Sequence, residues 1–151
     1  MKKIIFCFKT LILLVFLSKI TACNIAPGSY ANAEVYEMNV DECTLIEAIQ
    51  SFKKNYPQYN VPQQAQLQDG RKDSKDYWYY IYFYYPVEDQ IVSAWTRPSG
   101  KGKTDFAFVG IIQGLTPGNF KAINRNFGSS ENKEQKKKFE ERILNIIKEK
   151  L

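Results

Sequence analysis

The chain has 151 residues, a length typical of one domain, and its 21 basic and 16 acidic residues give a net charge of +5. It contains no histidine. This absence excludes Ser-His and Cys-His nucleophile pairs and removes the commonest zinc ligand.

The N-terminus has the layout of an export signal. Lys2 and Lys3 precede an apolar run that ends at Leu17, and this order is typical of a secretory signal. A membrane-spanning helix needs about 20 apolar residues, whereas Lys9 and Lys19 enclose a much shorter uncharged stretch. The pattern therefore predicts export rather than a transmembrane anchor.

A short motif follows the apolar run. Residues 20–23 read Ile-Thr-Ala-Cys, which resembles the lipobox of bacterial lipoproteins, and the resemblance covers residues 1–23 only. It implies cleavage after residue 22 and attachment of a diacylglycerol to the thiol of Cys23. Stable anchoring takes at least two acyl chains. Asn24 is not the aspartate of an inner-membrane retention signal, which favours the periplasmic face of the outer membrane in a source with two membranes.

Loss of the signal changes the charge and the cysteine content. Four lysines leave with it, which reduces the net charge from +5 to +1 and excludes the concentrated basic surface of a nucleic-acid-binding domain. With Cys7 removed and Cys23 lipidated, Cys43 is the remaining thiol. We expect it to be a small buried apolar residue, with pairing to another molecule as the alternative.

The rest of the chain divides into a tether and a single domain. Residues 23–33 are small and polar, and a flexible coil of this length spans about 17 Å. We therefore expect the domain, residues 34–151, to lie close to the membrane. Within it, Thr44 stands three residues before Glu47, which is the spacing of a capping box and predicts the start of a helix.

The middle of the domain favours strands. Residues 77–85 are β-favouring throughout, and all but one of them are aromatic. The predicted elements are a strand at 33–38, a helix at 44–56, a long polar loop at 57–76, strands at 77–85, 90–96 and 105–113, a helical turn at 120–124 and a helix from residue 131 to about residue 150. This order predicts an α+β fold, in which an antiparallel meander sheet of three to four strands is packed by an N-terminal and a C-terminal helix.

The aromatic strand is apolar on both of its faces. Trp78, Tyr80, Tyr82 and Tyr84 share one face, although a half-buried strand ordinarily has one polar face. Two interpretations stay open. The strand is either covered on both sides, with tyrosine hydroxyls reaching the surface, or it presents an exposed platform of residue types that dominate protein interfaces.

A basic, glycine-rich loop at residues 97–103 follows the second strand of the meander. It is either a solvated hairpin tip or a site for acidic surfaces or lipid headgroups. The last three residues of a phosphate-binding loop motif are matched by Gly102, Lys103 and Thr104. However, Arg97 stands where that motif requires its first glycine. A helix would also have to follow, whereas this loop joins two predicted strands, so we expect no nucleotide site.

We therefore expect a non-enzymatic envelope lipoprotein that binds another protein, as an inhibitor, as an immunity-type protein or as a subunit of an assembly. The alternative is a lipoprotein that binds cell-wall glycan by stacking sugars on Trp78, Tyr80 and Tyr82. No cofactor, metal or nucleic-acid partner is expected. The candidate binding residues are Trp78, Tyr80, Tyr82, Tyr84, Trp95, Arg97, Lys101 and Lys103.

Overall fold

The structure is a computed structural model that describes residues 30–116 and 118–151. The signal at residues 1–22, the lipobox cysteine Cys23 and the tether up to residue 29 lie outside the described residues. Within the described ranges, no helix is long and apolar enough to cross a membrane.

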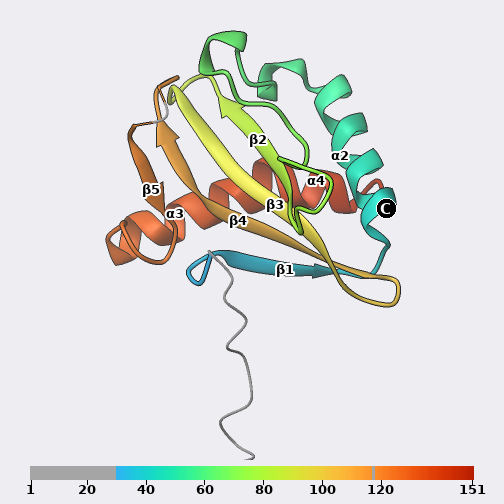
Figure 1. Ribbon diagram of the computed structural model, residues 1–151. Coiled ribbons are helices and arrows are strands. Elements are labelled where there is room, and N and C mark those ends of the chain that lie inside the picture. Colours follow the sequence, from blue (N-terminus) through green and yellow to red (C-terminus); the bar gives the residue numbers. More distant parts are fainter. Residues whose placement is uncertain (1–29, 117) are drawn as a thin grey trace, which may run out of the picture.

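One antiparallel sheet forms the centre of the domain (Figure 1). Its strands are β1 (Glu34–Met38), β2 (Tyr79–Tyr85), β3 (Gln90–Gly100), β4 (Lys103–Gln113) and β5 (Phe120–Ala122). The spatial order is β1-β4-β3-β2, and β5 also pairs with β4. The predicted meander corresponds to β2, β3 and β4, and the short N-terminal strand joins it at β4, so the α+β prediction is confirmed.

Helices cover one face of this sheet. Helix α2 spans Glu42–Asn55, and the C-terminal helix consists of α3 (Ser129–Phe139), a π-helical turn η3 (Glu140–Leu144) and α4 (Asn145–Lys148). Figure 1 shows the C-terminal helix running behind the strands, with α2 beside it. We call the helix-covered side of the sheet the inner face and the other side the outer face.

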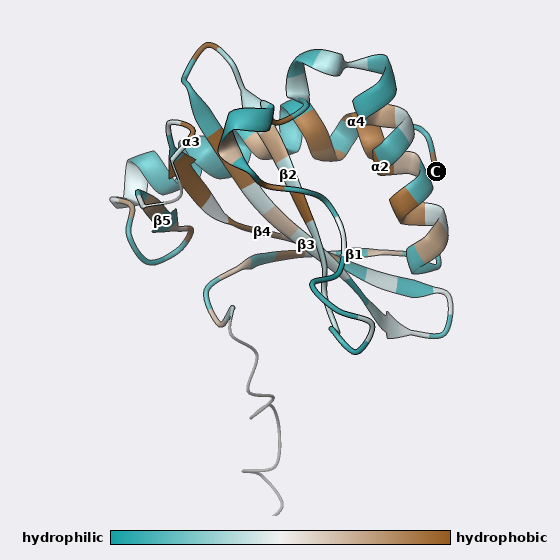
Figure 2. Cartoon of the chain, turned by 45° about the horizontal axis from the view of Figure 1, so that its top comes forward, coloured by the Kyte–Doolittle hydropathy of each residue, from teal (hydrophilic) through white to brown (hydrophobic). Residues whose placement is uncertain are grey.

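The inner face carries the main hydrophobic core. The ring of Phe139 lies 4.9 Å from the ring of Phe108 at an interplanar angle of 10° and also contacts Phe106 and Tyr36. Apolar residues at helical spacing on α2 pack into the same core. Figure 2 shows the corresponding division of hydropathy, with α3 largely hydrophilic and hydrophobic segments on α2 and α4. Phe139 therefore joins the C-terminal helix to three aromatic residues of the sheet.

A β-bulge separates the two halves of the β3–β4 pair. Ser93 pairs with Gly110 and Ala94 with Phe108, so Val109 is the extra residue and its side chain packs on the outer face. A Cβ atom at Gly110 would lie 2.3 Å from the carbonyl oxygen of Lys121. Glycine at this position therefore allows β5 to approach β4, and the prediction of a helical turn at 120–124 is wrong.

Other element boundaries also differ from the predictions. Strand β2 begins at Tyr79 rather than at residue 77. Helix α2 begins at Glu42 and has no side-chain cap hydrogen bond, which places Thr44 inside the helix and makes the capping-box prediction wrong. Cys43 is exposed, contrary to the expected burial, because other residues of α2 form its buried side: Leu45, Ala48, Ile49 and Phe52.

The predictions for the basic loop and for the C-terminal helix also differ from the structure. Strands β3 and β4 continue into the predicted loop at 97–103 and leave a two-residue turn at residues 101–102, where Gly102 has φ +65°. The helix expected from residue 131 contains the π-helical turn η3 and ends at Lys148. Leu151, expected on its apolar side, lies beyond this end and is exposed.

We expect Phe139→Ala to lower the free energy of unfolding by about 3–5 kcal/mol, since it removes a buried ring and leaves a cavity. Lys137→Ala is the matched control, because Lys137 lies on the same helix with an exposed side chain. Urea denaturation followed by circular dichroism measures both variants. A loss below about 1 kcal/mol for Phe139→Ala would contradict the central role of its ring stack.

Candidate functional site

The outer face of the sheet carries five aromatic residues in mutual contact, which we call the aromatic cluster: Tyr30, Tyr77, Trp78, Tyr80 and Trp95. The Tyr30 ring lies 5.5 Å from Trp78, 6.4 Å from Tyr80 and 6.2 Å from Trp95. These separations are typical of aromatic pairs. A residue that precedes the first strand thus packs on strands from the middle of the chain.

Two cations lie against the cluster. The guanidinium of Arg97 is 5.2 Å from the Trp95 ring and 5.8 Å from the Tyr77 ring, and the ammonium of Lys72 is 4.7 Å from the Tyr80 ring. All three distances are in the range of cation–π attraction. Arg97 also forms a salt bridge to Asp105 at 3.0 Å, which fixes its position over the rings.

Most of the cluster is closed to solvent. Trp95 is 3% exposed and Tyr80 8%, whereas Tyr77 is 55% exposed; Trp78, Tyr82 and Tyr84 are half-buried. The structure therefore supports the interpretation that β2 is covered on both sides. Among the described residues, the buried indole N–H groups of Trp78 and Trp95 have no hydrogen-bond partner.

The burial of Tyr80 also affects its hydroxyl. Burial raises the pKa of Tyr80, and the neighbouring Tyr30 side chain adds to the effect. The hydroxyl therefore stays protonated at neutral pH and remains a hydrogen-bond donor. The hydroxyl of Tyr84, near the opposite end of β2, already donates a hydrogen bond to Asp89 at 2.8 Å.

The long segment between α2 and β2 closes the free edge of β2. Gly70 exchanges two backbone hydrogen bonds with Tyr80, each 2.9 Å long, and Asp69 accepts the backbone N–H of Tyr82 at 3.0 Å. Lys53 binds both the Asp69 carboxylate and the Tyr82 carbonyl oxygen. The predicted loop is thus an ordered cover with two short 3-10 turns, η1 (Pro57–Tyr59) and η2 (Gln63–Ala65).

The buried position of the Lys53 ammonium group has a structural explanation. Burial lowers the pKa of its ammonium group, while Asp69 acts in the opposite direction. Both hydrogen bonds of the group hold the segment onto β2, so the lowered pKa does not mark a nucleophile.

A small polar hollow of about 160 Å³ lies between this segment and β2. Tyr80 and Tyr82 line it from the strand, and the remaining lining residues come from the segment: Gln68, Asp69, Gly70, Arg71 and Lys72. The hollow combines two aromatic side chains with a carboxylate and two cations. Of the sugar-stacking residues predicted from the sequence, it includes Tyr80 and Tyr82 but not Trp78.

The basic residues of the predicted loop lie apart from one another. Arg97 lies against the aromatic cluster, whereas Lys103 forms a 2.7 Å salt bridge to Glu37 on β1. Lys101 is exposed in the turn. The loop is therefore no single cationic site, and among its three basic residues Lys101 is the one without a salt bridge in the described part of the chain.

The chain enters the domain at a corner that the sequence did not reveal. We define the tether-exit corner as Tyr30, Asn32, Ala33, Val35, Phe120 and Arg125; all of these except Val35 help to line a hollow of about 140 Å³. Val35 continues the apolar surface because it pairs with Ala107 of the outer face. Val35 is 48% and Phe120 45% exposed.

Hydrogen bonds hold this corner rigidly. The Asn124 amide donates to the Asn32 carbonyl oxygen at 3.1 Å and to the Glu34 carboxylate at 2.9 Å, and Lys136 of α3 reaches the same carboxylate at 3.2 Å. Burial acts to raise the pKa of Glu34, but the bonds from Asn124 and Lys136 outweigh it and hold the pKa below its ordinary value. Packing thus includes Tyr30, which precedes the expected domain boundary at residue 34.

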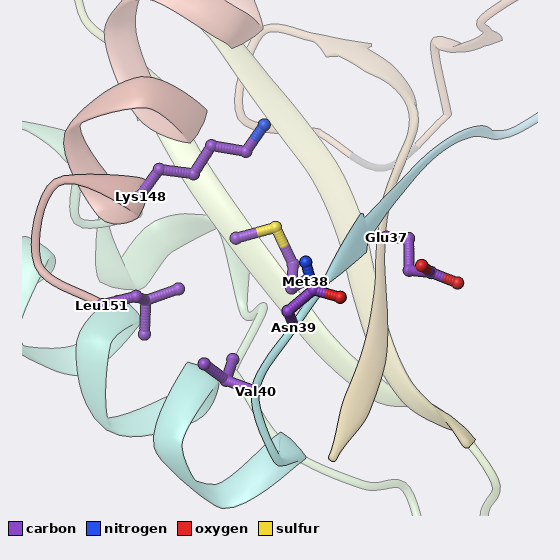
Figure 3. Close-up of a pocket in the computed structure, with 6 residues that line it drawn as sticks. All are labelled: Glu37, Met38, Asn39, Val40, Lys148 and Leu151. Atoms are coloured by element: carbon purple, nitrogen blue, oxygen red, sulfur yellow. The ribbon is translucent and has the colours of Figure 1, made fainter. Parts of the chain in front are cut away.

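A larger hollow lies elsewhere in the described part of the chain, between the end of β1 and the C-terminal helix. It measures about 390 Å³, with Met38, Val40 and Leu151 as its apolar lining and Glu37, Asn39 and Lys148 as its polar lining (Figure 3). Lys148 and Glu37 come from opposite sides of this hollow in the close-up. No local sequence pattern predicts it, because its lining residues come from both ends of the domain.

In the described part of the chain, no three metal-ligating side chains lie together. The comparison with family models finds no match for this chain, nor do the comparisons with curated proteins and with solved structures.

Tyr30→Ser tests the position of the chain entry. Both tryptophans of the chain contact Tyr30, so we expect its loss to shift the tryptophan emission to longer wavelength and to increase quenching by acrylamide. Tyr56→Ser is the control, since Tyr56 packs against Phe52 in the inner core. An unchanged spectrum for Tyr30→Ser, or an equal shift in both variants, would show that Tyr30 does not cover the cluster.

Proposed function

We propose that this chain is a non-enzymatic envelope lipoprotein that is held to a membrane by lipid on Cys23 and binds another protein. The lipobox-like motif at residues 20–23 supports the anchor, and Asn24 directly after it favours an outer-membrane location facing the periplasm. An inhibitory or immunity-type role and a role as an assembly subunit are two forms of the same proposal.

One observation carries the protein-binding part of the proposal. Tyr77 is 55% exposed and lies under Arg97 and beside the half-buried Trp78, whose ring packs in turn on the buried ring of Trp95. Tyrosine, tryptophan and arginine are the residue types enriched at the energetic centres of protein interfaces. A rigid base also reduces the side-chain entropy that an interface residue loses on binding.

The surroundings of Tyr77 fit a protein partner. Lys101 is exposed in the adjacent β3–β4 turn, and Arg97 keeps part of its side chain accessible beside Asp105. Together these residues surround an aromatic centre with charge, as in a polar rim around an apolar interface core. Of the candidate residues named from the sequence, we therefore place Arg97 and Lys101 at the contact and Trp95 and Tyr80 beneath it.

A photo-cross-linking amino acid at position 77 tests this surface in intact cells. We expect one discrete protein adduct, because the exposed Tyr77 ring is the proposed centre of contact. Position 87 is the matched control, since Val87 is 91% exposed in the β2–β3 turn, at the opposite end of β2.

Two further variants make the cross-linking decisive. Arg97→Ser should reduce the adduct at position 77 several-fold, and Cys23→Ser should reduce it by releasing the chain from the membrane. Equal adducts at positions 77 and 87, or none at either, would contradict a protein-binding surface at Tyr77.

A glycan-binding function is the second candidate, and the hollow beside β2 favours it. Tyr80 and Tyr82 line that hollow next to Asp69 and Lys72, which combines aromatic surface with the polar groups that bind sugar hydroxyls. Its volume of about 160 Å³ is suited to a single small polar unit rather than to a long chain.

Sedimentation with purified peptidoglycan tests the glycan alternative. If it is correct, the chain should sediment with the polymer, and Tyr82→Ser should abolish this because it removes the half-buried ring at the hollow. Tyr84→Ser is the control on the same strand and face, since Tyr84 does not line the hollow. Sedimentation that both variants retain, or no sedimentation of the parent chain, would exclude this use of the hollow.

A further inference from the structure

The tether-exit corner combines features of a surface that contacts lipid. Two large apolar side chains, Val35 and Phe120, are each nearly half exposed, and the exposed cation Arg125 lines the same hollow as Phe120. Arg125 is the cation of this corner, because the ammonium of Lys121, the residue after Phe120 on β5, lies 5.4 Å from the ring of Phe127 at the inner core. Apolar side chains flanked by cations are typical of protein surfaces that lie at the headgroup level of a membrane.

The path of the chain places this corner next to the anchor. Residues 24–29 are all that separate Cys23 from Tyr30, and fully extended backbone between these two positions spans at most about 25 Å. Tyr30 is fixed by contacts to Trp78, Tyr80 and Trp95, and Asn124 binds the carbonyl oxygen of Asn32. A lipid on Cys23 would therefore hold the corner, rather than another part of the domain, at the bilayer.

The charge of the corner is also compatible with phospholipid. The neighbouring carboxylate of Glu34, which lies outside the corner as defined, is already bound by Asn124 and Lys136, so its charge is compensated before any headgroup approaches. The guanidinium of Arg125 has the geometry for phosphate oxygens. By contrast, the exposed apolar residues Val87 and Leu151 lie in the β2–β3 turn and at the C-terminal residue, away from the tether.

We propose that the tether-exit corner rests on the phospholipid headgroup layer, with Phe120 and Val35 inserted at the interface and Arg125 bound to phosphate. The proposal rests on the proposed lipidation of Cys23. It gives the domain a fixed orientation: the β1–β5 side of the outer face meets the membrane, and the β2–β3 side with Tyr77 stays open to a protein partner.

Site-specific fluorescence on the lipidated full chain tests this orientation. An environment-sensitive label is attached at Phe120→Cys or Val35→Cys, each in a Cys43→Ser background, and the chain is incorporated into phosphatidylcholine vesicles with and without phosphatidylglycerol. Two positions serve as controls: the native thiol of Cys43, which is exposed on the helix layer, and Val87→Cys in the Cys43→Ser background, which is exposed on a turn.

We expect labels at 120 and 35 to emit at shorter wavelength in vesicles and to be quenched several-fold more by headgroup-labelled lipid than labels at 43 and 87. Equal quenching at all four positions, in chains that float with the vesicles, would overturn the proposed orientation and leave the anchor intact. Protection of 120 and 35 in native membranes but not in pure lipid would overturn it in favour of a protein cover.

The anchor is measured separately in the same samples. The mass of the N-terminal peptide shows whether Cys23 carries diacylglycerol, and flotation shows whether the chain stays with the vesicles. An unmodified Cys23 in chains that do not float would refute the proposed lipoprotein function itself. The use of two label sites, on β1 and on β5, guards against a local effect of either substitution.

Discussion

Strands β3 and β4 carry buried residues along both of their faces, so the sheet needs cover on two sides. Phe106, Phe108 and Val92 pack under the helices, whereas Trp95, Ala107 and Val109 pack on the outer face. Both helices lie on the inner side. The outer side is therefore covered by what remains of the chain: Tyr30 at the start of the domain and the segment between α2 and β2. The packing of Tyr30 on this side therefore determines where the chain enters the domain.

The same requirement explains how the sheet edges are completed. Gly70 and Asp69 bind the backbone of β2, which satisfies polar groups that an edge strand otherwise leaves open. At the other edge, β1 and β5 pair with successive stretches of β4. Gly110 makes this arrangement possible, since any side chain there would collide with β5. One glycine thus allows Phe120 to reach the outer face beside Tyr30.

The parts of the fold that depend on local pattern could be predicted from the sequence, and those that depend on distant contacts could not. Consecutive aromatic residues and short turns predicted the meander, and apolar spacing predicted the helices. Strand β5 was missed because its cause, the absent side chain of Gly110, lies on another strand. The site divides in the same way: the aromatic residues could be named, but the cover that Tyr30 provides depends on contacts across the sheet.

A rigid chain entry has a mechanical consequence for a lipid-anchored domain. A flexible tether allows a domain to rotate, so that any surface meets the membrane in turn. Here the contacts of Tyr30 and the hydrogen bond between Asn124 and Asn32 leave only residues 24–29 before the proposed anchor. With that short connection, even a weak lipid contact at Phe120 is favoured by high effective concentration. The orientation then follows from where the chain enters, and the entry follows from the need to cover an apolar sheet on its second face.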